Sequence, residues 1–577
     1  MDNNSRVVFF LVSCIIVLGV SQFFIPAPPP AAVNPSNPVS QSGATVTNAA
    51  PMAADESSDS TALAKALPKA QALNIPAASV TIETDDYTAI FSNEGAALTS
   101  FQLKKYQNRQ THQPVELVNS DPAHPKPFSL LYSGLPLNAQ RFTVEGSSKN
   151  LTQANEEAQL LFRYRNPQGL ILEKHFTFKN GSYLIGTEIT VSQAKPGSLE
   201  AGTLTVEWAD TLGREEMTAG TNSRVQGYRV ATLAGDHVYS ESMKKSQEAA
   251  EIPSPITWTA LANQFFMAAL IPDPSSGGAS VKVVRDNNAF KSPTPEDPNP
   301  GLDPKTFTPR PLLVFQTPEL KQGQSFKEKF QVFLGPQDYS LLKSLGLQLE
   351  RVIDLGTFGF ISVYMLALLQ WFFTLVHNWG LAVILLSVSV KLLLWLPTHN
   401  SYKNMYITQQ KMREVQPKVD ALKRKYPDDK QKQQQEQMKL FNEAGINPLG
   451  GCLPMLFQLP VFWALYATLN HSIELRGAHF LWLGDLTLHD PIYVLPFLMG
   501  GTMILQQKVS GQLATQAAGQ QKMMMWMMPV VLTFISTKWP AGLLLYWVVT
   551  NILSMVQQKV VNREVQKAKK KVEVVKS

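Results

Sequence analysis

Apolar and polar positions are patterned differently along the chain: short alternating runs dominate the first half and long continuous runs the second. One long run stands at the start. Residues 7–25 form nineteen positions without a charge, enough to cross a hydrocarbon core of about 30 Å. A cleaved signal peptide is the alternative, but the proline-rich stretch that follows is a poor cleavage site. We predict a transmembrane anchor over 1–25 and, from its Pro, Ala, Ser and Asn content, an extended linker over 26–60.

Short alternating runs broken by Gly, Pro and Asn fill residues 61–337. The segment 172–194 alternates on both sides of Asn180-Gly181, a strong local signal for a β-hairpin. Repeated strands and turns of this kind predict a large antiparallel β-sandwich over 61–337. Helical spacing returns near residue 338, so we predict a connector and an amphipathic helix over 338–377.

Five further apolar runs predict a five-helix core over residues 378–558. The runs cover residues 379–397, 450–472, 491–507, 523–539 and 541–558. The last two are short, so local thinning of the bilayer is expected around them. With the anchor, the pattern predicts a polytopic α-helical membrane protein with six transmembrane helices and one large β-sandwich.

Positive charge predicts which loops face the cytoplasm. Residues 399–449 carry ten Lys and Arg residues and the basic tail 559–577 carries seven, whereas 473–490 contain only Arg476. The first two segments are therefore predicted to be cytoplasmic, with both termini inside and the β domain outside. A crossing helix at 358–378 would place the β domain in the cytoplasm, so we expect this helix to lie in the membrane interface.

Composition adds mainly exclusions. The 577 residues contain two cysteines, Cys14 and Cys452, so the β domain has no disulfide framework. We find no phosphate-binding loop, no H-E-x-x-H motif and no Cys/His cluster, and expect no nucleotide, metal or other cofactor. The predicted helices of the core carry no acidic residue at membrane depth, which argues against an ion-coupled transporter.

A lysine inside an apolar run is the main candidate for function. Placing Lys391 at membrane depth costs about 2.5–3.5 kcal/mol on insertion scales. Ser387 lies four residues earlier, on the same helix face. Polar residues also occur in the cytoplasmic halves of the other runs, namely Gln458, Thr502, Gln506, Thr550, Asn551, Ser554 and Gln557. Their shared depth predicts a polar concavity open to the cytoplasm. The alternatives are a snorkelling lysine and polar side chains that bond their own backbone or link helices.

Methionine and basic residues supply two further candidate surfaces. The run "KMMMWMMP" suits contacts with varied apolar partners, although lipid-facing or core packing is an equal alternative. The expected apolar slide comprises Met499, Met503, Met527, Met528 and Phe534. Residues 399–449 predict a helical hairpin that turns at "YPDDK" and acts either as a docking arm or only as a charged loop that sets orientation. Candidate docking residues are Lys411, Arg413, Lys423, Arg424, Lys569, Lys570 and Lys571, which suit ribosomal RNA or anionic lipid.

Three segments carry a family resemblance: "NWGLAVILLSVSVKLLLWLP", "NPLGGCLPMLFQLPVFWALYATL" and "MMPVVLTFISTKWPAGLLLYWVVTNILSMVQQ". They resemble the YidC family of membrane protein insertases, which has mitochondrial and chloroplast relatives. The resemblance covers about 350–560 and implies a hydrophilic groove with a positive charge, usually arginine, that attracts substrate. Lys391 stands at that position, and Tyr546 and Trp547 stand where the family often has two tyrosines. The β domain would resemble a sugar-epimerase-type supersandwich.

The resemblance implies an insertase and membrane chaperone of the bacterial inner membrane, not an enzyme. Its expected partners are nascent membrane proteins, the Sec translocon, the ribosome with the signal-recognition targeting machinery, and membrane lipids. Two other classes remain open from the residues themselves. One is a solute or anion transporter that uses Lys391 as its site. The other is an anchored periplasmic binding protein in which the β domain is the active part.

Overall fold

The computed structural model describes most of the chain after residue 74. The described residues are 75–109, 111–118, 126–208, 212, 228–242, 250–274, 278–286, 308–427, 429–446, 453–510 and 519–576. The predicted anchor, 1–25, and the predicted linker, 26–60, lie outside the described residues.

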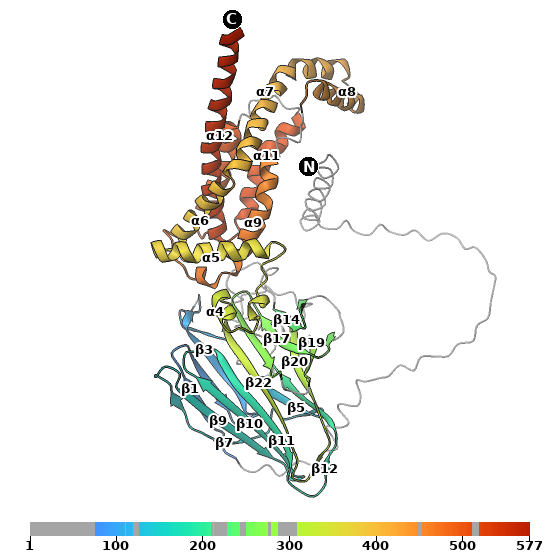
Figure 1. The fold of residues 1–577 in the computed structure, drawn as a ribbon, viewed down its shortest axis with the longest axis vertical. Coiled ribbons are helices and arrows are strands. Elements are labelled where there is room, and N and C mark those ends of the chain that lie inside the picture. Colours follow the sequence, from blue (N-terminus) through green and yellow to red (C-terminus); the bar gives the residue numbers. More distant parts are fainter. Residues whose placement is uncertain are drawn as a thin grey trace, which may run out of the picture. The chain divides into compact units, whose positions relative to one another are not determined.

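The largest sheet of the β domain has nine strands, in the order β15-β14-β17-β18-β22-β11-β10-β9-β7 (Figure 1). Its strands are β7 (Thr143–Glu145), β9 (Glu157–Arg165), β10 (Leu170–Lys179), β11 (Leu184–Gln193), β14 (Arg229–Ala234), β15 (His237–Ser242), β17 (Ile256–Ala262), β18 (Phe266–Pro272) and β22 (Ser325–Pro336). Strands β10 and β11 pair antiparallel, as predicted from Asn180-Gly181, and Gly181 adopts the positive φ of 78° that this turn requires. Side chains along both strands alternate strictly between the core and the surface.

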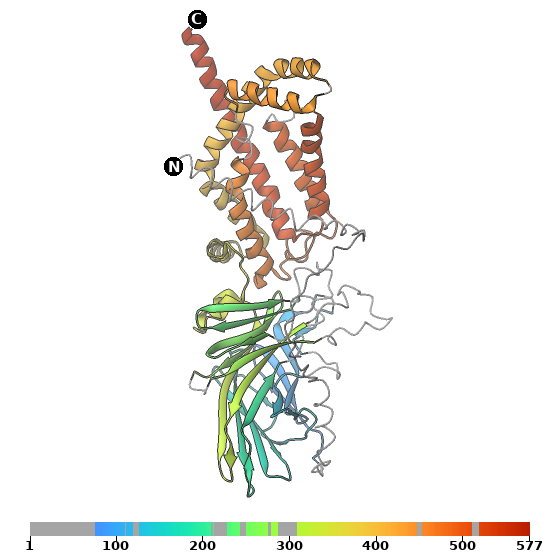
Figure 2. The same cartoon turned by 90° about the vertical axis from the view of Figure 1, so that its right-hand side faces the viewer.

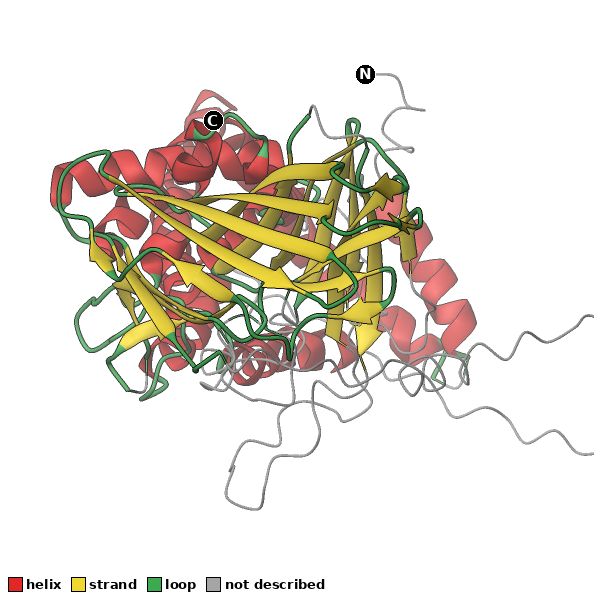
Figure 3. Cartoon of the chain, turned by 90° about the horizontal axis from the view of Figure 1, so that it is seen from below, coloured by secondary structure: helices red, strands yellow, loops and turns green. Residues whose placement is uncertain are grey.

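Three smaller sheets complete the domain, and Figure 3 shows the strands lying in layers. The six-stranded sheet contains β16 (Ala250–Ile252), β19 (Ser280–Asp286), β20 (Thr308–Thr317), β13 (Gly202–Glu207), β5 (Ser129–Tyr132) and β6 (Leu135–Pro136). The five-stranded sheet contains β4 (Pro114–Glu116), β3 (Ala97–Gln107), β2 (Tyr87–Ser92), β1 (Ser79–Glu83) and β8 (Lys149–Asn150), and a small sheet pairs β12 (Ser198–Leu199) with β21 (Leu320–Lys321). Pairings between described strands are antiparallel, apart from a two-residue parallel pairing of β1 with β8. The predicted antiparallel β-sandwich is thus present.

A fully buried lysine crosses the aromatic core of this sandwich. Lys174 on β10 donates its ammonium to the carbonyl oxygens of Gly95, Ala96 and Phe128, at 2.6, 3.2 and 2.7 Å. The ammonium also lies 5.4 Å from the ring centroid of Phe142. Burial lowers the pKa of Lys174 to about 7. The three carbonyls use all three N–H donors of the charged side chain.

The connector is part of the β domain's packing rather than a free link. Helix α4 (Tyr339–Ser344) begins at Asp338, whose carboxylate accepts from the Leu341 amide, and a short 3₁₀ turn, η1 (Leu349–Val352), follows. Leu342, Leu349 and Val352 are buried in the same hydrophobic core as the sheets.

The described helices that follow begin with α5 (Gly359–Val376), α6 (Trp379–Leu393), α7 (Trp395–Lys425) and α8 (Lys430–Glu443). They continue with α9 (Leu453–His471), the 3₁₀ turn η3 (Ile473–Leu475), α10 (Val494–Val509), α11 (Gly519–Ser536) and α12 (Ala541–Lys576). Helix α5 runs across α6, α9 and α12 instead of along them (Figures 1 and 2). Of the described helices, α5 alone is long and apolar enough to cross a membrane by itself, whereas α6 and α7 meet that criterion only together, with a 65° bend between them.

The predicted helical hairpin and basic tail are both helical. Helix α7 ends at Lys425, and α8 begins after Asp429, whose side chain accepts from the Lys432 amide, so the chain reverses at the predicted "YPDDK" turn. Helix α12 runs unbroken over 36 residues and includes the basic tail up to Lys576. The first turns of α7 pack along α12 through Tyr402, Met405 and Val561.

Candidate functional site

Lys391 is buried near the end of α6, with 6% of its surface exposed. Its ammonium donates to the Ser554 hydroxyl of α12 at 2.8 Å and lies 5.4 Å from the ring centroid of Tyr402 on α7. Among the described residues no carboxylate pairs with it. One hydroxyl and one aromatic face are weak compensation for a buried charge that has three donors. The ammonium therefore keeps capacity to bind an anion.

A second polar contact joins α10 to α12. Asn551 donates its side-chain amide to the Thr502 hydroxyl at 3.0 Å, and that hydroxyl donates to the Met499 carbonyl at 2.8 Å. Both side chains are buried. This contact brings together two of the predicted groove residues, Thr502 and Asn551.

A third contact joins α12 to the start of α7. Gln557 donates its side-chain amide to the Trp395 carbonyl at 3.0 Å and to the Thr398 hydroxyl at 3.1 Å. Residues from four helices thus form one buried group, here called the polar cluster: Lys391, Thr398, Thr502, Asn551, Ser554 and Gln557.

The remaining predicted groove residues lie nearby with different roles. Ser387 is buried, but its hydroxyl donates to the Val383 carbonyl of its own helix at 2.6 Å, and Thr550 likewise donates to the Tyr546 carbonyl at 2.9 Å. Gln458 hydrogen-bonds with the side chain of Tyr546. Trp547 stacks on Trp539 with ring centroids 5.4 Å apart.

The predicted apolar slide divides into exposed and buried members. Met527, Met528 and Phe534 on α11 are 50%, 48% and 66% exposed, consistent with an apolar outer face. Met503 is half-buried, and Met499 is fully buried in the helical core. Met499 therefore packs helices together in this structure instead of joining the exposed face.

The basic docking candidates are arranged along α7 and α12. Lys411, Arg413 and Arg424 are exposed, and Lys411 lies 3.5 Å from the carbonyls that end α8. Lys423 pairs with Asp420 at 3.5 Å. The backbone of residues 569–571 continues α12, but the side chains of Lys569, Lys570 and Lys571 lie outside the described part of the structure.

Tyr402 and Thr398 are the site residues that the sequence pattern did not single out. Tyr402 falls in the segment assigned to the charged hairpin, because the basic residues that begin at Lys403 dominate its neighbourhood. The three-residue spacing of Tyr402 and Met405, on either side of Lys403, is the signal that indicates burial of one face of the first turns of α7.

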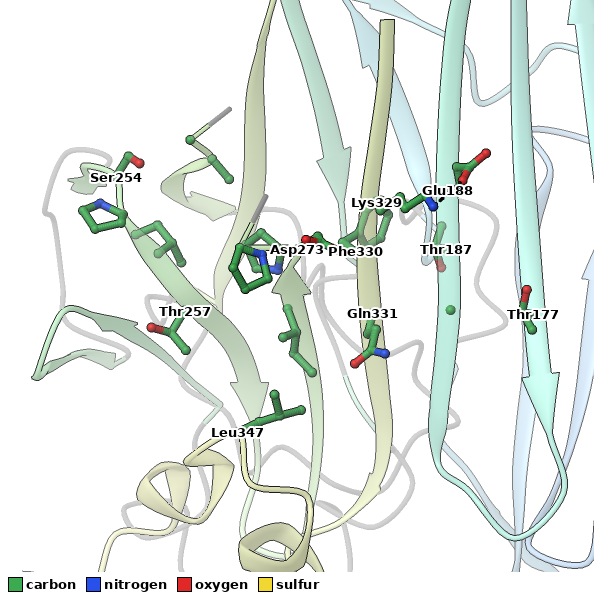
Figure 4. Close-up of a pocket in the computed structure, with 18 of the residues that line it drawn as sticks. Thr177, Thr187, Glu188, Ser254, Thr257, Asp273, Lys329, Phe330, Gln331 and Leu347 are labelled. Atoms are coloured by element: carbon green, nitrogen blue, oxygen red, sulfur yellow. Dashed lines mark ion pairs between the residues drawn. The ribbon is translucent and has the colours of Figure 1, made fainter. Parts of the chain in front are cut away.

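A separate cavity of about 720 Å³ lies on the nine-stranded sheet (Figure 4). Its polar lining includes His175, Glu188, Thr257, Asp273 and Lys329, and Lys329 pairs with Glu188 at 3.4 Å. None of its lining residues belongs to the polar cluster. The described structure thus offers two chemically different places, one in each domain.

Comparison with known proteins identifies both domains. A family model described as the YidC periplasmic domain matches residues 79–368, and one described as the 60Kd inner membrane protein matches residues 371–570. The membrane protein insertase YidC of Geobacter metallireducens is 32% identical over 569 residues, covering 97% of this chain and 98% of that protein. The relative of the same description from Geotalea uraniireducens is 34% identical over 569 residues, covering 97% and 99%.

Solved structures give weaker likenesses. An active YidC insertase with its first transmembrane domain resolved aligns with 85% of this chain and 94% of its own, at 18% identity and a TM-score of 0.34. A galactose mutarotase-like protein from Lactobacillus casei aligns with 44% of this chain and 100% of its own, at 12% identity and a TM-score of 0.29. Neither value adds to the argument.

This chain has a β-sandwich that precedes a helical core with a buried lysine. Relatives that match it over nearly their whole length are described as membrane protein insertases, and these observations together define the class. The matches extend over both domains and nearly the whole chain. The chain therefore belongs to the YidC family.

Proposed function

We propose that the chain inserts proteins into the inner membrane through a groove around the polar cluster, open to the cytoplasm and to lipid. The observation that carries this proposal is the poor compensation of Lys391: a buried ammonium with one hydroxyl partner and no ion pair among the described residues. An incoming segment with an acidic flank supplies the missing anion. Polar partners such as Asn551 and Thr502 solvate that flank while it is out of water.

The apolar part of the substrate leaves along the exposed face of α11. Met527, Met528 and Phe534 offer flexible and aromatic contacts there. Burial of the segment in lipid contributes about 25 cal/mol per Å² of apolar surface, so no nucleotide and no enzymatic step are required. This reading assigns five spans to the core, one to the anchor, and an interfacial position to α5.

The cytoplasmic side of the protein receives the substrate. The exposed basic residues on the α7–α8 hairpin and the basic end of α12 suit the ribosome, the signal-recognition targeting machinery and anionic lipid. The protein acts alone or together with the Sec translocon. Both termini are cytoplasmic and the β domain is periplasmic in this arrangement.

Lys391 is tested by replacing it in cells depleted of the wild-type protein. We expect Lys391→Ala to slow insertion of a one-span substrate with an acidic translocated tail about tenfold, and Lys391→Arg to restore it, because a point charge suffices for attraction. Insertion is measured by protease protection of the translocated tail.

Two controls accompany this experiment. A substrate with a neutral tail should lose less than twofold, and Lys508→Ala, at an exposed lysine near the end of α10, should leave both substrates unaffected. Insertion of the acidic tail by Lys391→Ala at the wild-type rate would show that the electrostatic role is wrong.

A further inference from the structure

The loop that joins α9 to α10, residues 472–493, contains a closed hydrogen-bond network with the β domain. Arg109, in the turn after β3, donates Nε to Asp485 Oδ2 at 3.0 Å and Nη2 to the Thr487 hydroxyl at 2.7 Å. Thr487 donates its amide and its hydroxyl to Asp485 Oδ1, at 2.8 and 2.6 Å. The side chains of Arg109 and Asp485 are 10% and 7% exposed. Both carboxylate oxygens of Asp485 therefore accept hydrogen bonds in a contact that is largely buried from solvent.

The same loop holds the first turn of α12. The carbonyls of Leu486 and Leu488 accept from the amides of Gly542 and Ala541, at 2.9 and 2.7 Å. These amides belong to a helix start, where the helix itself offers no acceptor. Thr487, which accepts from Arg109, lies in the chain between Leu486 and Leu488. The carbonyls of these two leucines are the ones that accept from the first amides of α12.

The loop also holds the start of α10. Asp490 is fully buried, and its carboxylate accepts from the amides of Ile492 and Leu495, at 3.1 and 2.7 Å, and from the Trp482 indole at 3.1 Å. One loop thereby fixes the starts of the two helices that carry Thr502 and Asn551. Rotation or displacement of this loop changes how those side chains meet.

Four more contacts tie the loop and the end of α9 to the β domain. Arg476 donates to the Gln107 carbonyl at 2.6 Å and lies over the ring of Phe266. Gln264 donates to the Asn470 carbonyl at 2.7 Å. Ile473 is buried within the hydrophobic core of the β domain itself.

We propose that Arg109 is a positioning residue for insertion: it acts through Asp485 and Thr487 to fix the starts of α10 and α12 and so the geometry of the polar cluster. This gives the β domain a task in the reaction although it lies outside the helical core. The role of Arg109 in insertion rests on the proposed function above, whereas the mechanical coupling rests only on the contacts of the 472–493 loop.

The coupling is tested by amide hydrogen exchange on the full-length protein in lipid nanodiscs. We expect Arg109→Ala to speed exchange at Ala541, Gly542 and Leu495 at least about tenfold, because local opening governs exchange there. The β10–β11 ladder should exchange at the wild-type rate. Asp485→Asn should reproduce the effect from the other side, and the double variant should add little to either single one, as expected for residues of one network.

Insertion of the acidic-tailed substrate is measured on the same variants. We expect Arg109→Ala to slow insertion severalfold and Arg109→Lys to recover part of the loss. Arg163→Ala is the matched control, since Arg163 forms two surface ion pairs within the β domain and should change neither measurement.

The possible failures are distinguishable. Wild-type exchange at Ala541 and Gly542 in Arg109→Ala overturns the coupling, and so does faster exchange that extends into the β10–β11 ladder, which indicates general unfolding. Faster exchange with unchanged insertion overturns the positioning role. Failure of the Lys391 variants to affect insertion instead counts against the proposed function and leaves the exchange result intact.

Discussion

The β domain and the helical core each bury a lysine, and the two lysines differ in how many hydrogen-bond acceptors surround the ammonium. Lys174 in the β domain gives all three donors to backbone carbonyls. Lys391 in the helical core gives one donor to a hydroxyl and places its charge near an aromatic ring. Burial alone therefore does not tell what a lysine does; the number of acceptors around it does.

The acceptors of Lys174 also explain its position. Ala96 and Phe128 adopt positive φ values of 45° and 67°, a region that side chains disfavour. The ammonium bridges their carbonyls and Gly95, and so holds two turns of the β domain together. Lys174 joins parts of the β domain through all three donors, whereas Lys391 has one hydrogen-bond acceptor among the described residues, and the proposed function assigns its remaining donors to substrate.

The same substitution at both sites should separate these roles most strongly. Lys174→Met leaves three buried carbonyls without a donor, which should lower the free energy of unfolding of the β domain by about 3 kcal/mol. The loss is measured by amide exchange of the β10–β11 ladder in the full-length protein. Lys179→Met, at the exposed end of the same strand, is the control.

Lys391→Met should behave oppositely. Replacing a buried charge that lacks an ion pair by an apolar side chain of similar length is neutral or stabilising, so thermal unfolding of the core should not shift downward, while insertion of acidic tails should fall. A destabilised core in Lys391→Met, or an unchanged β domain in Lys174→Met, would remove the contrast between the two lysines.

The pH dependence of stability gives a second and smaller difference. The pKa of Lys174 is lowered from 10.5 to about 7 by burial, so between these values the unfolded chain binds more protons than the folded one. Stability from this group should rise with pH, by about 2 kcal/mol between pH 7 and 9, and should be flat below pH 7. The slope is measured as the difference between wild type and Lys174→Met, which cancels other titrating groups. An equal slope in both proteins would contradict it.

The smallest effect concerns two serines near Lys391. Ser554 accepts from the ammonium, whereas the Ser387 hydroxyl is bound to its own helix. We expect Ser554→Ala to slow insertion about fivefold, near the 1 kcal/mol of one hydrogen bond, because the ammonium then turns toward the end of its helix. Ser387→Ala should stay within twofold. A larger loss of insertion in Ser387→Ala than in Ser554→Ala would contradict this assignment and favour Ser387, four residues before Lys391, as the partner of the lysine.

Local patterns in the sequence predicted the structural features that depend on residues close together in the chain. The Asn180-Gly181 hairpin, the reversal before Lys430 and the burial of Thr502 and Asn551 on facing helices follow from periodicity and turn chemistry. The partner of Lys391 did not follow, because helix rotation decides whether Ser387 or Ser554 faces it.

Contacts between residues far apart in the sequence could not be predicted, because they also depend on how the elements are arranged in space. Strand β22 pairs with both β11 and β18, which lie far apart along the chain, and no local pattern encodes that order. The contact of Arg109 with Asp485 joins residues 376 positions apart. In the sequence, Arg109 and Asp485 are each typical of an exposed turn, and only the folded chain places them in contact.

The unbroken length of α12 has one more consequence. Its 36 residues measure about 54 Å at 1.5 Å per residue. The helix is a single rod that begins at the carbonyls of Leu486 and Leu488, carries Asn551 and Ser554 in its first half and ends in the basic residues. A tilt imposed on the basic end also moves Asn551 and Ser554, the members of the polar cluster that this helix carries. Because Ser554 accepts from the Lys391 ammonium, a substrate that binds the tail under the proposed function and tilts α12 would change the contacts of that lysine through this one helix.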